Sequence, residues 1–163
     1  MTPLPAALER LRRDHVANAR QGVPAHITLL YPFARPDRRL AGLRGAVAEV
    51  CRATAPFGFA LTAARLQGSI AYLAPRPERP LLQLIAALVT AFPEYPRYGG
   101  AYAEVLPHVT IAESSERLLL EVVRAEAARH LPIQQTARAL VLLREGRDGH
   151  WRRGWRVPLG GGG

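Results

Sequence analysis

Lysine is absent from this chain, and cysteine occurs only once, as Cys51. A single cysteine excludes an internal disulfide, and its place within an apolar helical pattern predicts a small buried side chain. Long apolar runs are missing as well, because the stretch over residues 81–89 is interrupted by Gln83 and falls far short of the ~20 residues that a membrane span needs. No basic segment followed by an apolar one opens the chain, so no signal peptide is indicated. These absences predict a cytoplasmic protein without membrane contact.

The missing lysines leave arginine as the sole source of the basic charge. The 22 basic residues exceed the 13 acidic ones and give a formal net charge of +9. Two interpretations stay open: attraction to a polyanion such as RNA, or an arginine-rich composition spread over solvated faces. The arginines are scattered from Arg10 to Arg156 without a dense block. In either case a basic field suits a substrate that carries phosphate.

The length predicts one domain. A chain of 163 residues with 48% hydrophobic residues has enough apolar material to bury a substantial core. We therefore expect a single domain over residues 1–163. The glycines at 160–163 predict a disordered tail.

One short sequence motif occurs twice. Residues 23–30, the first motif, read Val-Pro-Ala-His-Ile-Thr-Leu-Leu, and residues 105–112, the second motif, read Val-Leu-Pro-His-Val-Thr-Ile-Ala. Side chains two positions apart on a strand point to the same face. Each motif thus presents a histidine and a threonine together, with apolar residues facing the other way. These pairs are His26 with Thr28, and His108 with Thr110.

The first motif belongs to the N-terminal half of a larger repeat. Hydrophobic periodicity predicts a helix over residues 6–19, with Leu8 and Leu11 facing inward and Glu9, Arg12 and Arg13 facing solvent. A strand over 25–31 follows, then a helix that Asp37 caps and that ends near residue 54. Strands over 57–66 and 69–74 complete this half.

The second half repeats the order of helix, strand, helix, strand, strand. The predicted elements are a helix over 80–92, a strand over 103–112, a helix over 114–130 that begins near Ser114, and strands over 133–144 and 150–157. The motif histidines are half a chain apart, and each lies on the second element of its half. Two halves related by a pseudo-twofold axis would bring both motifs to one central cleft.

Paired His-x-Thr units suit chemistry at a phosphodiester. A neutral imidazole can take a proton from an attacking hydroxyl or water, and a protonated one can give a proton to the leaving oxygen. Threonine hydroxyls can donate to the non-bridging oxygens, where charge grows in the transition state. Two histidines could instead bind Zn²⁺, but a catalytic zinc site needs a third protein ligand, and no Cys, Asp or further His adjoins either motif. We therefore predict neither a metal nor a cofactor.

Other residues are weaker candidates for substrate contacts. Aromatic side chains can stack on a base, although each could equally pack in the core or a loop; the candidates are Tyr31, Phe33, Tyr98, Tyr102 and Trp155. Of these, Tyr31 follows the first motif and Trp155 lies on the last predicted strand. Arg144 and Arg153 could face the phosphate or solvate a surface.

The paired H-Φ-T-Φ units (Φ, apolar), their spacing and the duplication resemble the 2H phosphoesterase superfamily. The sequences of residues 22–33 and 106–112 are similar to those of its bacterial 2′-5′ RNA ligase-like branch. The resemblance implies a bilobal α+β fold whose antiparallel sheets line a central cleft, with helices packed outside. It also implies metal-independent and ATP-independent hydrolysis or ligation of 2′,3′-cyclic or 2′-5′ phosphodiesters, in RNA ends or small nucleotides. Within it, His26 and His108 take the acid and base roles, in an order left open, and Thr28 and Thr110 bind phosphate.

Two further expectations follow. Family members usually carry a strand before the first helix, which this sequence does not show before residue 6, so we expect an open sheet edge and either a monomer or a weak homodimer. The alternative function is a non-catalytic RNA- or nucleotide-binding module that retains the fold. Intact His-x-Thr units in both halves argue against it, because binding alone does not require two titratable groups.

Overall fold

The structure is a computed structural model, and it describes residues 1–33, 40–100 and 106–161. Asp37 and Tyr102 therefore lie outside the described residues. The helices are α1 (Ala6–His15), α2 (Ala17–Arg20), α3 (Leu40–Arg52), α4 (Arg79–Ala91) and α5 (Arg117–Ala128), with 3-10 turns η1 (Arg97–Gly100) and η2 (Leu159–Gly161). The strands are β1 (Phe57–Gln67), β2 (Ile70–Arg76), β3 (Val109–Glu113), β4 (Ile133–Ala137), β5 (Ala139–Glu145) and β6 (Trp151–Pro158).

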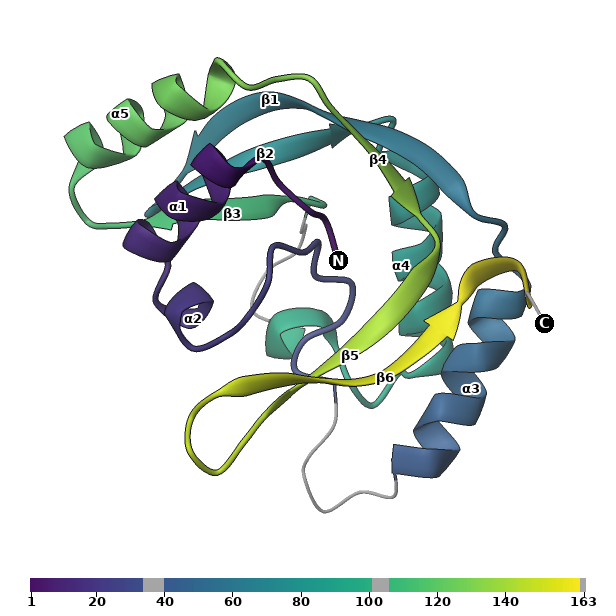
Figure 1. Cartoon of the computed structure of the whole chain (residues 1–163). Coiled ribbons are helices and arrows are strands. Elements are labelled where there is room, and N and C mark those ends of the chain that lie inside the picture. Colours follow the sequence, from purple (N-terminus) through teal and green to yellow (C-terminus); the bar gives the residue numbers. More distant parts are fainter. Residues whose placement is uncertain (34–39, 101–105, 162–163) are drawn as a thin grey trace.

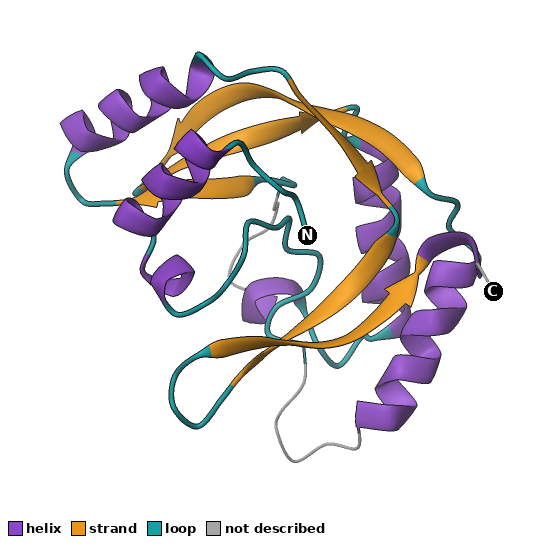
Figure 2. Cartoon of the chain, viewed as in Figure 1, coloured by secondary structure: helices purple, strands orange, loops and turns teal. Residues whose placement is uncertain are grey.

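The strands form two antiparallel sheets, which Figures 1 and 2 show as one curled surface with helices around it. The larger sheet has four strands in the order β3-β2-β1-β4, and the smaller one is the β5-β6 hairpin. Elements from the two halves of the sequence pack together in both sheets. The β1-β2 hairpin of the N-terminal half pairs with β3 of the C-terminal half, and α5 packs on β1 and β2. Conversely, α3 packs on β6. The predicted α+β class with antiparallel sheets and outer helices is confirmed.

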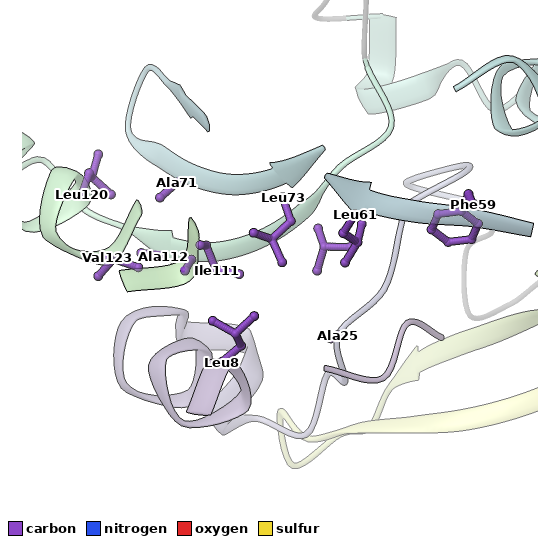
Figure 3. Close-up of a cluster of buried hydrophobic side chains, with 12 residues drawn as sticks. Leu8, Ala25, Phe59, Leu61, Ala71, Leu73, Ile111, Ala112, Leu120 and Val123 are labelled. Atoms are coloured by element: carbon purple, nitrogen blue, oxygen red, sulfur yellow. The ribbon is translucent and has the colours of Figure 1, made fainter. Parts of the chain in front are cut away.

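The first hydrophobic core lies against the four-stranded sheet. It joins Leu8 of α1 to alternate residues of the strands and to one face of α5, as Figure 3 shows for most of its members. Val109 and Ile111 of the second motif are fully buried in it, as the strand periodicity predicts. The second motif is thus anchored from its apolar side, and its polar side is left for other contacts.

The second core lies against the β5-β6 hairpin. It gathers side chains from α3, α4 and the residue that follows it, β6 and η2: Val47, Cys51, Leu84, Leu88, Phe92, Val157 and Leu159. Cys51 is fully buried, as its place in the pattern predicts. Phe57 and Ala137 pack against both cores, so the two lobes are continuous. Within the described part of the chain, no helix is long and apolar enough to cross a membrane.

The strand predicted over residues 25–31 is wrong. This segment forms neither helix nor strand. Its backbone is held by separate partners rather than by a ladder; for example, the Ala25 carbonyl accepts from the Thr2 amide at 2.9 Å. Pro24 and Pro32 bracket the segment and have no N–H to donate to a neighbouring strand. The alternating pattern therefore marks a half-buried segment without a sheet partner.

Other boundaries also differ from the sequence predictions; the helix predicted over 6–19, for example, is divided into α1 and α2. The strand predicted over 133–144 is two strands, because the chain leaves β1 after β4, turns at Arg138 and pairs again with β6 as β5. No glycine or proline interrupts residues 133–145 at this corner, so the sequence alone hides the change of sheet. The strand predicted over 103–112 begins only at Val109; residues 103–105 lie outside the described residues. Helix α5 begins at Arg117, after the Ser114 hydroxyl has accepted from the Glu116 amide.

Candidate active site

Both motifs line one cleft. Its volume is about 830 Å³, and its walls come from α1, the first motif, β2, β3 and the β5-β6 hairpin. His26, Thr28, His108 and Thr110 all line it. The structure therefore brings together the four residues that the repeated motif singles out, although only one of the two motifs is on a strand.

In the second motif, backbone and aromatic contacts fix the imidazole. His108 Nδ1 lies 2.8 Å from the Leu106 carbonyl oxygen. The ring of Tyr72, a buried residue of β2, meets the His108 ring edge-on with centroids 5.5 Å apart. Tyr72 is also the register partner of Thr110 across the β2-β3 pair. These contacts leave His108 Nε2 as the ring nitrogen available to a bound molecule.

The first motif repeats this geometry without a strand. His26 Nδ1 lies 2.8 Å from the Pro24 carbonyl, again the carbonyl two residues earlier. A carbonyl oxygen only accepts, so Nδ1 carries the proton and Nε2 of the neutral ring is an acceptor. The Thr28 hydroxyl, 3.1 Å from His26 Nε2, then donates to it. Both motifs thus hold an imidazole through Nδ1.

The surroundings of His26 favour its neutral form. Burial lowers the pKa of His26, and the nearby charges of Arg12, the Met1 amino group and His108 lower it further. The bond to the Pro24 carbonyl raises the pKa of His26, but by less than burial lowers it. Near neutral pH, His26 is therefore available as a proton acceptor.

The predicted solvent exposure of Arg12 is wrong. Sequence polarity places it on the solvent side of the first helix, yet its residue surface is only 3% exposed and it lines the cleft. The missed signal is its position four residues after Leu8, which puts both residues on one helix face. Its guanidinium donates to backbone carbonyls rather than to a carboxylate within the described residues. Charge alone therefore misassigned its side of the helix.

Only some of the weaker candidates for substrate contacts line the cleft. Tyr31, Trp155 and Arg144 line the cleft, and Tyr31 lies beside Tyr98 with ring centroids 6.2 Å apart. Trp155 also packs against the second core, and its Nε1 is buried without a hydrogen-bond partner in the described part of the chain. Arg153 is exposed on β6 and is not among the residues that line the cleft.

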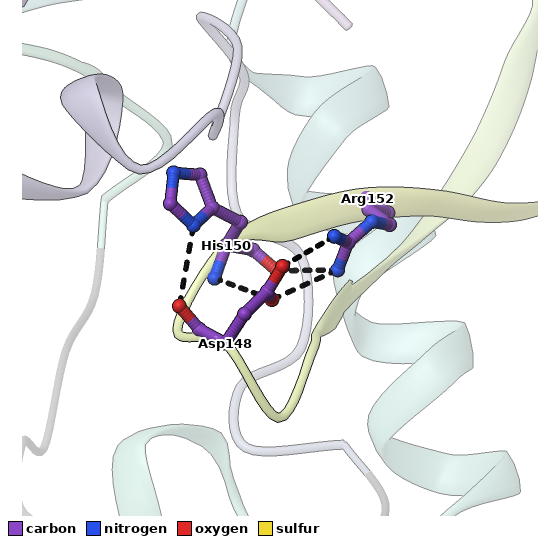
Figure 4. Close-up of polar contacts among 3 residues, drawn as sticks. All are labelled: Asp148, His150 and Arg152. Carbon is purple, nitrogen blue, oxygen red and sulfur yellow. Dashed lines mark hydrogen bonds and ion pairs between the residues drawn. The ribbon is translucent and has the colours of Figure 1, made fainter.

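The β5-β6 hairpin joins the cleft through a residue that the sequence reading missed. Trp151 lines the cleft, and its amide donates to the Gln21 carbonyl at 2.7 Å, just ahead of the first motif. The turn before it is fixed by Asp148, which accepts from the His150 amide and from Arg152 (Figure 4). The Arg152 bonds hold the pKa of Asp148 well below its usual range. The turn thus helps to place Trp151 beside the chain that leads to His26.

Gly22 lies at the junction where the chain leading to the first motif closely approaches the β5-β6 hairpin. Its φ is +93°, a conformation that side chains rarely adopt, and an added Cβ would lie 2.9 Å from the Trp151 carbonyl oxygen. We expect Gly22→Ala to lower the free energy of unfolding by more than about 1 kcal/mol, measured by urea denaturation. Gly45→Ala is the matched control, because Gly45 lies in α3 with open space around it and should gain about 0.5–1 kcal/mol. Equal stability of Gly22→Ala and the wild type would contradict this account of the junction.

The donor set for a metal is poor. Among the described residues, no three His, Cys, Asp or Glu side chains gather closely enough to hold a metal ion. Glu113 lines the cleft with the two motif histidines but does not form such a group with them.

Comparison with solved structures supports the fold. The chain is similar to Thermus thermophilus protein TT0787, with a TM-score of 0.60 and 18% identity over 96% of this chain and 94% of that one. It is also similar to E. coli LigT complexed with NADP+ (TM-score 0.53, 19% identity, 97% and 94% coverage). A third match is E. coli LigT complexed with 3′-AMP (TM-score 0.52, 19% identity, 97% and 94% coverage). At these identities the likeness establishes the fold.

A comparison with curated proteins finds no match. The sequence model of the 2′-5′ RNA ligase superfamily, in contrast, matches residues 2–149, which include both His-x-Thr motifs and most of the cleft. By this match, the chain belongs to the 2′-5′ RNA ligase superfamily.

Proposed function

We propose that this member of the superfamily is a metal-independent phosphodiesterase that opens 2′,3′-cyclic or 2′-5′ phosphodiesters of RNA ends or small nucleotides. The observation that carries the proposal is the shared geometry of the motifs. Each imidazole is held by a backbone carbonyl at Nδ1, and each motif places its threonine on the same cleft. Two imidazoles held in this way are the minimum apparatus for acid–base work at phosphorus. A bound phosphate takes over the Thr28 hydroxyl, which in the structure donates to His26 Nε2, and so frees that nitrogen for proton transfer.

The proposed hydrolysis needs no covalent intermediate. His26 Nε2 takes a proton from water as the water oxygen bonds to phosphorus. The bond from phosphorus to the leaving ribose oxygen breaks, and protonated His108 gives its Nε2 proton to that oxygen. The lowered pKa of His26 favours it as the base in this direction. In ligation the same steps run backwards and the two histidines exchange roles.

The remaining features support a phosphate-bearing ligand. Thr28 and Thr110 are the proposed donors to the non-bridging oxygens, where charge accumulates. The cleft of about 830 Å³ is within the usual range for a site that holds a small molecule. Tyr31 and Trp155 offer aromatic surfaces on its wall, and Arg144 offers a positive charge. LigT, a protein of similar fold, has been crystallised with NADP+, ATP and 3′-AMP, which favours a nucleotide as the ligand here too.

The test is turnover by purified protein. We expect 2′,3′-cyclic nucleotides or 2′-5′-linked oligonucleotides to be cleaved at the same rate with and without EDTA. Loss of the activity in EDTA would refute the metal-independent mechanism. Binding of these compounds without turnover would favour the non-catalytic nucleotide-binding module instead.

The setting of the enzyme is a proposal as well. We place it in the cytoplasm, where a lone buried thiol such as Cys51 stays reduced. We propose a monomer or weak homodimer, and light scattering at increasing protein concentration distinguishes these from a stable oligomer.

A further inference from the structure

Arg12 is a buried charge beside the cleft. Among the side chains whose burial the structure describes, it is the one charged residue in the buried class, at 3% exposure. No carboxylate of the described residues forms an ion pair with it; Glu9 and Glu113 act on it only from a distance. Burying an unpaired charge costs several kcal/mol, and an apolar residue of similar size would avoid that cost. The position therefore calls for an explanation other than stability.

The contacts of Arg12 join the two motifs. From the last turn of α1, its Nη1 donates to the Val23 carbonyl at 2.8 Å, and its Nε donates to the Thr110 carbonyl at 3.2 Å. A third, longer contact of 3.5 Å runs from Nη2 to Asn18 Oδ1. Val23 opens the first motif, and Thr110 belongs to the second. One guanidinium thus spans two segments that lie far apart in the sequence.

The first motif needs such an anchor more than the second. The second motif continues into β3 and is fixed by its register with β2. The first motif has no ladder, so its place depends on single hydrogen bonds such as the one from Arg12 to Val23. The rigid fork of a guanidinium can serve two carbonyls at once, whereas the ammonium of a lysine is a point charge on a flexible stem.

We propose that Arg12 is a positioning residue, which holds the first motif at a fixed distance from the second so that His26 and His108 can act on one phosphate group. This inference rests on the proposed function. The charge of Arg12 gives it a second effect that can be measured separately. It faces His26 together with the Met1 amino group and His108, and all three charges disfavour the protonated His26 ring.

The test compares Arg12→Lys, Arg12→Met and Arg13→Met. Arg13 is the matched control, because it is the next residue of α1 and is exposed. Two quantities are measured: the pKa of His26, by NMR titration of its ring protons, and kcat and KM on a 2′,3′-cyclic nucleotide. In Arg12→Met we expect the pKa of His26 to rise and kcat to fall about 10²-fold through misplacement of the base. In Arg12→Lys we expect the pKa of His26 to stay low while kcat falls and KM changes little.

Each outcome is decisive. Arg12→Met that folds, titrates at His26 as the wild type does and keeps kcat within about twofold overturns the proposal. If Arg12→Met does not fold, Arg12→Lys decides. Wild-type kcat in Arg12→Lys would show that the guanidinium geometry is not required, and would overturn the proposal. If the wild type turns over no phosphodiester, the proposed function fails, while the His26 titrations still report whether Arg12 acts on the first motif.

Discussion

Replacing either His26 or His108 with alanine is expected to lower kcat on a 2′,3′-cyclic nucleotide by about 10²–10⁴-fold, since each removes one proton-transfer group. The reason is the geometry of the cleft. Each imidazole is oriented through Nδ1 by a carbonyl of its own motif, so nothing in the other motif substitutes for it. The double variant should lose little more than the worse single one, because the two groups act as a unit. Steady-state kinetics at fixed pH measures all three.

The control for these variants is His130→Ala. His130 follows α5, contacts Glu126 and does not line the cleft. Its removal should leave kcat within about twofold, since surface substitutions rarely have large effects. Circular dichroism must show that each histidine variant keeps its fold. A folded His26→Ala or His108→Ala enzyme with most of the wild-type activity would show that the two imidazoles are not the acid and base.

Leu73→Ala is expected to lower the free energy of unfolding by about 2–5 kcal/mol, because it leaves a cavity in a fully packed core. Leu73 is fully buried on β2 and pairs in the β2-β3 register with Val109. Val109 is the residue that directly follows His108. The same cavity loosens the support of the second motif, so kcat should fall even where the variant is fully folded. Urea denaturation at 25 °C gives the stability change, and kinetics below the transition gives the effect on the site.

The matched control is Leu118→Ala on the solvent face of α5, where the residue is 78% exposed. Its removal should change stability by less than about 0.5 kcal/mol. If Leu73→Ala were no more destabilised than Leu118→Ala, the packing of the first core would be misassigned. If its stability fell but its kcat did not, the second motif would be supported independently of that core.

Elements governed by local pattern could be predicted from the sequence. The alternation of β1 and the long apolar face of α4 depend on residues within those elements, and both match their predicted ranges closely. The convergence of His26 and His108 was also predictable, because an internal repeat carries its own symmetry. The burial of Cys51 was predictable too, from its place in an apolar helical pattern.

What depends on tertiary partners could not be predicted. The first motif alternates like a strand, but no neighbouring strand is there to pair with it, and a single sequence does not reveal that. The corner at Arg138 is not marked in the sequence, because no glycine or proline separates β4 from β5. Arg12 was assigned to solvent because charge usually outweighs helix position, and only the two carbonyls that it meets explain the exception.

The most direct test of the central claim is a crystal structure of the wild-type protein with inorganic phosphate. We predict one phosphate in the cleft, with His26 Nε2 and His108 Nε2 both within about 3.2 Å of its oxygens and the Thr28 and Thr110 hydroxyls donating to it. A phosphate held by only one of the two motifs, or a cleft that stays without phosphate at saturating concentration, would contradict the claim that the repeated His-x-Thr units form a single site.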